Sequence, residues 1–117
     1  MSIFTIIAID ESMATQEYVL PPRPGYDALK RVLGPIFEEQ RKGAHFEHVA
    51  VLGDDGRPTD MFVDDTGALL GHPINLAATR VYHRASIARG EHHERGIIPG
   101  APMIYGLVVV FDRRVWF

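Results

Sequence analysis

The feature that most constrains the fold is a nearly uninterrupted apolar run, MIYGLVVVF, at residues 103–111. Such a run is typical of a β-strand covered on both faces, because a strand with one face in water alternates apolar and polar residues. We therefore expect residues 103–111 to form a strand near the centre of a sheet. The chain has no cysteine, so no disulfide contributes and the fold must depend on burial.

Other segments predict further strands. Residues 3–9 are rich in β-branched side chains and predict another central strand, with residues 18–20 as a short extended segment after it. Two strand-like runs, residues 46–52 and 60–64, flank a cluster of Gly, Asp and Pro at residues 53–58. This arrangement predicts a β-hairpin with a longer loop.

Two helices are predicted. The first begins near residue 25, after a Pro-rich segment that excludes regular structure. Gly34-Pro35 should end or kink this helix, or Pro35 should begin a second helical segment at residues 36–42. The other helix covers residues 76–85, and Asn75 is placed to cap its N-terminus.

The order of these elements predicts the fold class. With 117 residues the chain has the common size of one domain, and it contains no repeat, low-complexity tract or linker. We therefore expect residues 1–117 to form a single domain. Strand, strand, helix, hairpin, helix and strand in this order predict an α+β fold, a small and mostly antiparallel sheet with two helices packed on it.

Charge and the first residues bear on location and partners. The apolar start of the chain is too short to span a membrane and lacks the basic segment of a signal peptide, so we expect a cytoplasmic protein without membrane contact. The net charge of −3 combines −6 over residues 1–67 with +3 over residues 68–117. Because no uniformly basic surface follows from this pattern, direct nucleic-acid binding is not expected.

Three motifs carry a resemblance to a known family. They are MFVDDTG at residues 61–67, GHPINLAAT at residues 71–79 together with Tyr82, and IPG at residues 98–100 before the last apolar run. In these motifs the chain resembles domain of unknown function 3846, a family of small phage, plasmid and bacterial proteins. Asp65 replaces the usual glutamate of that family. The resemblance implies a fold and a mobile-element context, and it transfers no catalytic residue.

The same motifs have a structural interpretation. Asp64 and Asp65 can close a turn through side-chain hydrogen bonds, and Gly67 can adopt a positive φ. Pro73 then directs the chain toward the helix that Asn75 caps. The alternative is that Asp64 and Asp65 face a ligand or a metal at the rim of the sheet.

Metal and catalytic motifs give weaker signals. His45 and His48 lie three residues apart, and His92, His93 and Glu94 follow one another, but neither spacing directs the side chains to one point. We therefore expect no metal and no cofactor.

No nucleophile elbow, phosphate loop or zinc-protease motif is present, so no catalytic residue is assigned. An acid/base pair of Asp64 with His72 or His83 stays open as an alternative.

Basic residues in the second half of the chain form the candidate ligand site. Arginine binds phosphate oxygens through two parallel hydrogen bonds, and a capped helix N-terminus attracts anions. A tyrosine here can stack on a base or pack in the core. The alternative for the arginines is a solvated helix face. We place the candidate site at Asn75, Arg80, Tyr82, His83, Arg84 and Arg89.

These observations predict a non-enzymatic accessory protein of a phage or other mobile element that binds or sequesters an anionic, nucleotide-like ligand, as an anti-defence protein does. One alternative is an interaction module that inhibits a host protein through its acidic hairpin. Another is a small hydrolase. The final pair, Trp116 and Phe117, would be an unusual apolar patch in water, so it should dock on its own sheet or on a partner subunit, and we expect a homodimer.

Overall fold

A computed structural model describes residues 2–8, 10, 12–18, 20–40, 45–53, 55–64, 72–88 and 103–116. The strands are β1 (Ser2–Ile7), β2 (Met13–Tyr18), β3 (Phe46–Leu52), β4 (Pro58–Asp64) and β5 (Val108–Phe111). The helices are α1 (Tyr26–Gln40) and α2 (Leu76–Ala88). Predictions that concern residues 65–71 and 89–102, including the turn at Gly67, lie outside the described residues.

The strands form one five-stranded sheet in the order β2-β1-β5-β4-β3, and each neighbouring pair is antiparallel. The predicted α+β fold with an antiparallel sheet is therefore confirmed. β5 occupies the middle of the sheet, as the apolar run predicts, but its regular part is short. Before it, Gly106 has a φ of 77°, and Tyr105 makes an isolated bridge to Ile74.

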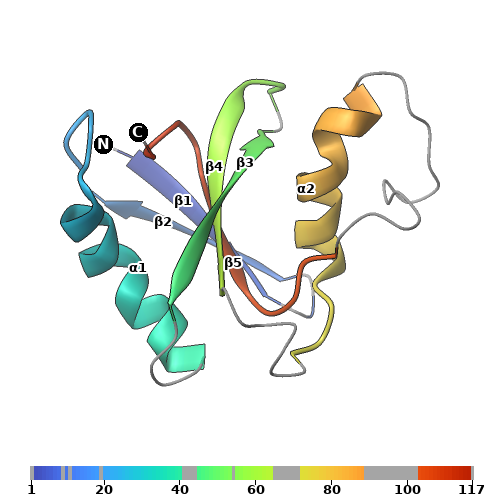
Figure 1. The fold of residues 1–117 in the computed structure, drawn as a ribbon, viewed down its shortest axis with the longest axis horizontal. Coiled ribbons are helices and arrows are strands. Elements are labelled where there is room, and N and C mark those ends of the chain that lie inside the picture. Colours follow the sequence, from blue (N-terminus) through green and yellow to red (C-terminus); the bar gives the residue numbers. More distant parts are fainter. Residues whose placement is uncertain are drawn as a thin grey trace.

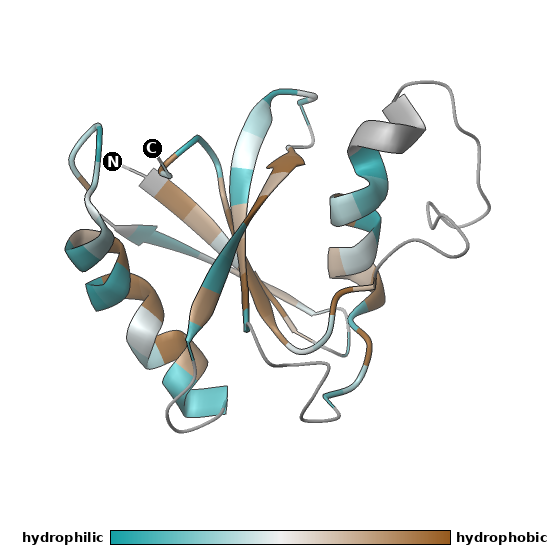
Figure 2. Cartoon of the chain, viewed as in Figure 1, coloured by the Kyte–Doolittle hydropathy of each residue, from teal (hydrophilic) through white to brown (hydrophobic). Residues whose placement is uncertain are grey.

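The two helices cover opposite faces of the sheet (Figure 1). Side chains alternate along β4, so Phe62 packs with α1 in one hydrophobic cluster, whereas Met61 and Val63 pack with α2 in a second. Figure 2 shows hydrophobic residues on the inner strands and on the inward flank of α1, while much of β2 is hydrophilic. Among the described residues, no helix is long and apolar enough to cross a membrane.

Two sequence predictions need correction. The second strand covers Met13–Tyr18 rather than residues 18–20. In addition, α1 does not end at Gly34-Pro35 but continues to Gln40 with Pro35 inside it. Proline removes one helical hydrogen bond, but Pro35 and Arg31 are exposed and water can bind the carbonyl that is left. Burial of Phe37 beyond the proline stabilises the continued helix.

The predicted β-hairpin is confirmed as β3 and β4, which pair from Phe46 with Asp64 to Leu52 with Pro58. In its turn the Gly53 amide donates to the Arg57 carbonyl at 2.8 Å. Gly56 has a φ of 77°, a conformation that few other residues adopt readily. The hairpin turn therefore forms one end of the sheet, and it borders the site described next.

Candidate functional site

A hollow of about 370 Å³ lies between α2 and the strands β1 and β2. Its volume falls at the lower end of the range of small-ligand sites, roughly 300–1,000 Å³. The floor and sides are mainly apolar and are formed by Ile3, Thr5, Ile7, Met13, Val81 and Val110. The hollow is thus on the same face of the sheet as α2 and opposite to α1.

The floor of the hollow follows from strand geometry. Ile3, Thr5 and Ile7 are two residues apart in β1, so their side chains point to the same face of the sheet. In the register with β2, Ile7 is opposite Met13. Met13 is 63% exposed, which makes it an accessible apolar wall at one end of the hollow.

The other end of the hollow is polar and lies beside the hairpin turn. Asp55 belongs to that turn, and Arg84 is held against it because its Nη1 donates to the Leu52 carbonyl at 3.0 Å. The amide of Asp112 donates to the carbonyl of Ile3, so Asp112 lies at the same end of the sheet. The Thr59 hydroxyl donates to the Phe111 carbonyl at 2.6 Å. The hollow is therefore amphipathic along its length.

The predicted arginines differ in their relation to this hollow. Arg84 lines it, whereas Arg80 is partly buried and is not among its lining residues. Arg89 lies outside the described residues. Both Arg80 and Arg84 also have a further interaction within the protein. Of the two predicted arginines that the structure describes, it therefore brings Arg84 to the hollow, at the end where the charged groups gather.

The other predicted residues of α2 contribute to the core. His83 is 3% exposed, and its ring lies 5.6 Å from that of Tyr82. Tyr82 is partly buried and packs against the hydrophobic cluster between α2 and the sheet. Of the two interpretations given to Tyr82, the contacts match the one that places it in the core.

Asn75 caps α2, as predicted, and also joins the helix to the sheet. Its Oδ1 accepts a hydrogen bond from the Ala78 amide at 3.0 Å. Its Nδ2 donates to the carbonyls of Ile7 at 3.0 Å and Gly106 at 2.9 Å. The side chain is fully buried, so it positions α2 above the hollow rather than contacting a guest.

Asp64 lies beside His72, with 3.7 Å between Oδ2 and Nε2. This separation is longer than a hydrogen bond, and the buried Nε2 atom of His72 has no hydrogen-bond partner among the described residues. Asp65 lies outside the described residues. Because the Asp64 side chain is fully buried, this pair has no exposed carboxylate to offer a substrate.

No group of three metal-ligating side chains occurs among the residues that the structure describes. His45 is exposed, whereas His48 contacts Asp60. The cluster His92, His93 and Glu94 lies outside the described residues.

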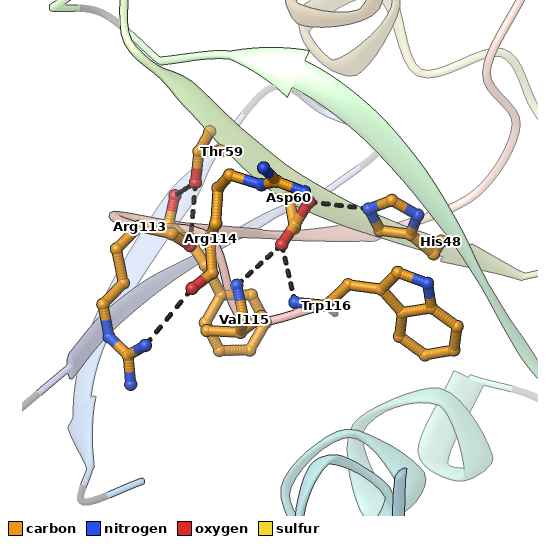
Figure 3. Close-up of polar contacts among 8 residues, drawn as sticks. His48, Thr59, Asp60, Arg113, Arg114, Val115 and Trp116 are labelled. Carbon is orange, nitrogen blue, oxygen red and sulfur yellow. Dashed lines mark hydrogen bonds and ion pairs between the residues drawn. The ribbon is translucent and has the colours of Figure 1, made fainter. Parts of the chain in front are cut away.

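A polar cluster that the sequence did not indicate surrounds Asp60 (Figure 3). The Asp60 carboxylate is 1% exposed, and its Oδ2 accepts from the amides of Val115 at 2.7 Å and Trp116 at 2.8 Å. Its Oδ1 lies 2.6 Å from Nε2 of His48. The Trp116 ring stacks on the His48 ring with a centroid distance of 5.2 Å and an angle of 9°.

Trp116 therefore docks on its own sheet, one of the two arrangements expected for the final aromatic pair, while Phe117 lies outside the described residues. For the cluster around Asp60, the sequence offered one signal, a single acidic residue followed by an apolar run in β4. The hydrogen-bond partners of Asp60 could not be inferred from the sequence, because Val115 is 55 residues away along the chain.

Comparisons of the chain with protein-family models, with curated proteins and with solved structures found no match. The resemblance to domain of unknown function 3846 therefore stays a prediction. Function has to be inferred from the geometry and chemistry of the hollow.

Proposed function

We propose that this protein binds a compact, anionic, nucleotide-like ligand in the hollow between α2 and strands β1 and β2. The observation that carries the proposal is the amphipathic lining, with the Arg84 guanidinium at the polar end and an apolar floor beside it. Ligand sites commonly combine such a floor with a few polar groups that orient the guest.

Arg84 supports binding of the anionic group. Its contact with the Leu52 carbonyl holds one nitrogen of the guanidinium and thereby orients the planar group. A side chain that is already oriented loses less conformational entropy when a ligand binds. Arginine also binds phosphate oxygens through charge-assisted hydrogen bonds, which are stronger than neutral ones.

The floor supports binding of a base. Ile3 and Val110 are partly exposed and offer aliphatic surface to one face of a planar ring. The exposed Met13 adds a polarisable thioether, which interacts favourably with aromatic rings. The size of the hollow suits a mononucleotide better than a longer guest.

Binding without turnover is the activity we propose. The described lining residues include two carboxylates, Asp55 and Asp112, but no histidine, serine or lysine beside them that would form a nucleophile–base pair. Sequestration by an accessory protein of a mobile element, as in anti-defence, is the biological role that the family resemblance suggests. The hydrolase alternative has less support, because Asp64 is buried and does not line the hollow.

The interaction-module alternative also has less support. Asp60 and Asp64 supply two of the carboxylates of the predicted acidic hairpin, and both are buried. A buried carboxylate cannot present charge to a partner surface. Among the described acidic residues of the hairpin, only Asp55 and Glu47 are exposed.

The test is ligand binding by the purified chain and by Arg84→Ala. We expect ribonucleotides to raise the melting temperature of the wild type, because a ligand that binds only the folded state stabilises it. Loss of the guanidinium should weaken binding by about tenfold or more, as expected for one charge-assisted contact.

Arg31→Ala is the matched control, since Arg31 is exposed on α1, on the opposite face of the sheet. It should bind like the wild type. Arg84→Lys retains the charge and should bind with intermediate affinity, and circular dichroism without ligand checks that each variant is folded. The proposal is wrong if no nucleotide at millimolar concentration shifts the wild-type melting temperature.

A further inference from the structure

The charges that line the hollow restrict which charged and polar groups its ligand can carry. One cation, Arg84, faces two carboxylates, those of Asp55 and Asp112, among the described lining residues. A ligand whose polar part carries only negative charge would be attracted by Arg84 and repelled by Asp55 and Asp112. A guest with one anionic group and several hydrogen-bond donors matches all three.

The two carboxylates differ in availability. Asp55 accepts a hydrogen bond from the Arg57 amide at 2.9 Å, and its Oδ2 lies 4.0 Å from Nε of Arg57. Asp112 is exposed, and within the described part of the chain its carboxylate has no hydrogen-bond or ion-pair partner. Asp112 is therefore the stronger candidate for contact with a ligand.

Strand geometry also directs Asp112 toward the hollow. Val108 and Val110 face the α2 side of the sheet, and Asp112 follows them at the same two-residue spacing, directly after the end of β5. The bond from its amide to the Ile3 carbonyl continues the pairing of β5 with β1 and holds this part of the backbone. Asp112 thus lines the hollow at its polar end from a backbone that this pairing holds.

We infer that the preferred guest is a ribonucleoside monophosphate, with its phosphate at Arg84 and its sugar hydroxyls at Asp112. A carboxylate accepts hydrogen bonds and donates none when ionised, so vicinal hydroxyls are a suitable partner. Acidic side chains bind ribose hydroxyls in the same way in dinucleotide sites. This inference rests on the proposed function and names the ligand class of the same site.

The inference predicts two preferences. Removing the 2′-hydroxyl of the nucleotide should weaken binding by about tenfold, because a hydrogen bond to a charged acceptor is lost. Adding two phosphates should not improve binding and should weaken it at low salt, since the extra charges approach Asp55 and Asp112.

The experiment is isothermal titration calorimetry of the full chain with adenosine monophosphate, its 2′-deoxy analogue and adenosine triphosphate, repeated with the guanine series. Asp112→Asn should reduce the preference for ribose from about tenfold to less than about threefold, because it weakens binding of the ribose form, which loses two hydroxyl contacts with a charged acceptor, more than binding of the deoxy analogue, which loses one. Glu38→Gln, an exposed change on α1, is the matched control and should keep the wild-type preferences.

The outcomes separate the inference from the function on which it rests. If nucleotides bind but ribose and deoxyribose forms bind equally, or the triphosphate binds better, the inference is overturned and the proposed function stands. An unchanged ribose preference in Asp112→Asn excludes the role of Asp112. If neither series binds, the proposed function itself fails.

Discussion

Aspartate is a charged residue in most proteins, yet Asp60 lies in the interior, between the sheet and the end of the chain. A buried carboxylate is tolerated when its oxygens are satisfied, and here two amides and one imidazole satisfy them. The amides belong to Val115 and Trp116, so this side chain fastens the last segment to β4. Its role is structural, and it lies on the α1 face, away from the hollow.

The first prediction concerns that attachment. Asp60→Ala should lower the free energy of unfolding by about 3–5 kcal/mol, because it leaves the two amides without their acceptor. Asp60→Asn should cost less, about 1–2 kcal/mol, since the amide oxygen can still accept. Urea denaturation can be followed by the fluorescence of Trp116, the single tryptophan of the chain.

Glu17→Ala on the exposed strand β2 is the control for removing a carboxylate. It should change the free energy of unfolding by no more than about 0.5 kcal/mol. A loss below about 1 kcal/mol for Asp60→Ala would contradict the role assigned to the carboxylate.

At the scale of elements, the features that could be predicted depend on neighbours in sequence. The hairpin follows from two strand-like runs around a turn cluster, and the cap of α2 follows from Asn75 before an apolar helix. The course of α1 through Pro35 could not be predicted, because burial of Phe37 against the sheet decides it. Local propensity indicates where a helix can break, and packing decides whether it breaks there.

The second prediction separates the two roles of Asn75. Aspartate caps helices as well as asparagine, so Asn75→Asp would be nearly neutral if capping were its whole function. In this fold its carboxylate would instead face the carbonyls of Ile7 and Gly106. We therefore expect a loss of about 2–4 kcal/mol in the free energy of unfolding, measured by urea denaturation.

Gln16→Glu provides the same change from amide to carboxylate at an exposed position of β2 and should be nearly neutral. A neutral result for Asn75→Asp would mean that the bonds from Nδ2 contribute little to stability.

At the scale of the whole molecule, the sequence predicted an antiparallel sheet with two helices but not that they cover opposite faces. That arrangement depends on which side chains of β4 and β5 face each helix, and both faces of these strands are apolar. The hollow could not be predicted either, because it forms from residues of β1, β2, the hairpin turn, β4, α2 and the end of β5. Arg84 was predicted from its residue type, whereas Asp112 gave no local signal.

The last prediction follows from the order of strands in the sheet. β5 is paired on both sides and buried on both faces, while β2 is paired only with β1 and its residues 13–17 are exposed. Amide hydrogens should therefore exchange at least about a hundredfold more slowly in β5 than in β2, because opening β5 requires loss of most of the core. Hydrogen exchange measured by NMR on the folded chain gives both rates.

The predicted homodimer can be tested in the same experiment. Trp116 packs on its own His48, and the edge strand β2 is a second surface that another copy could use. If two chains pair along the edge of β2, its protection should rise with protein concentration. If β2 exchanges at one rate from micromolar to millimolar protein while light scattering reports a monomer, the homodimer prediction is wrong.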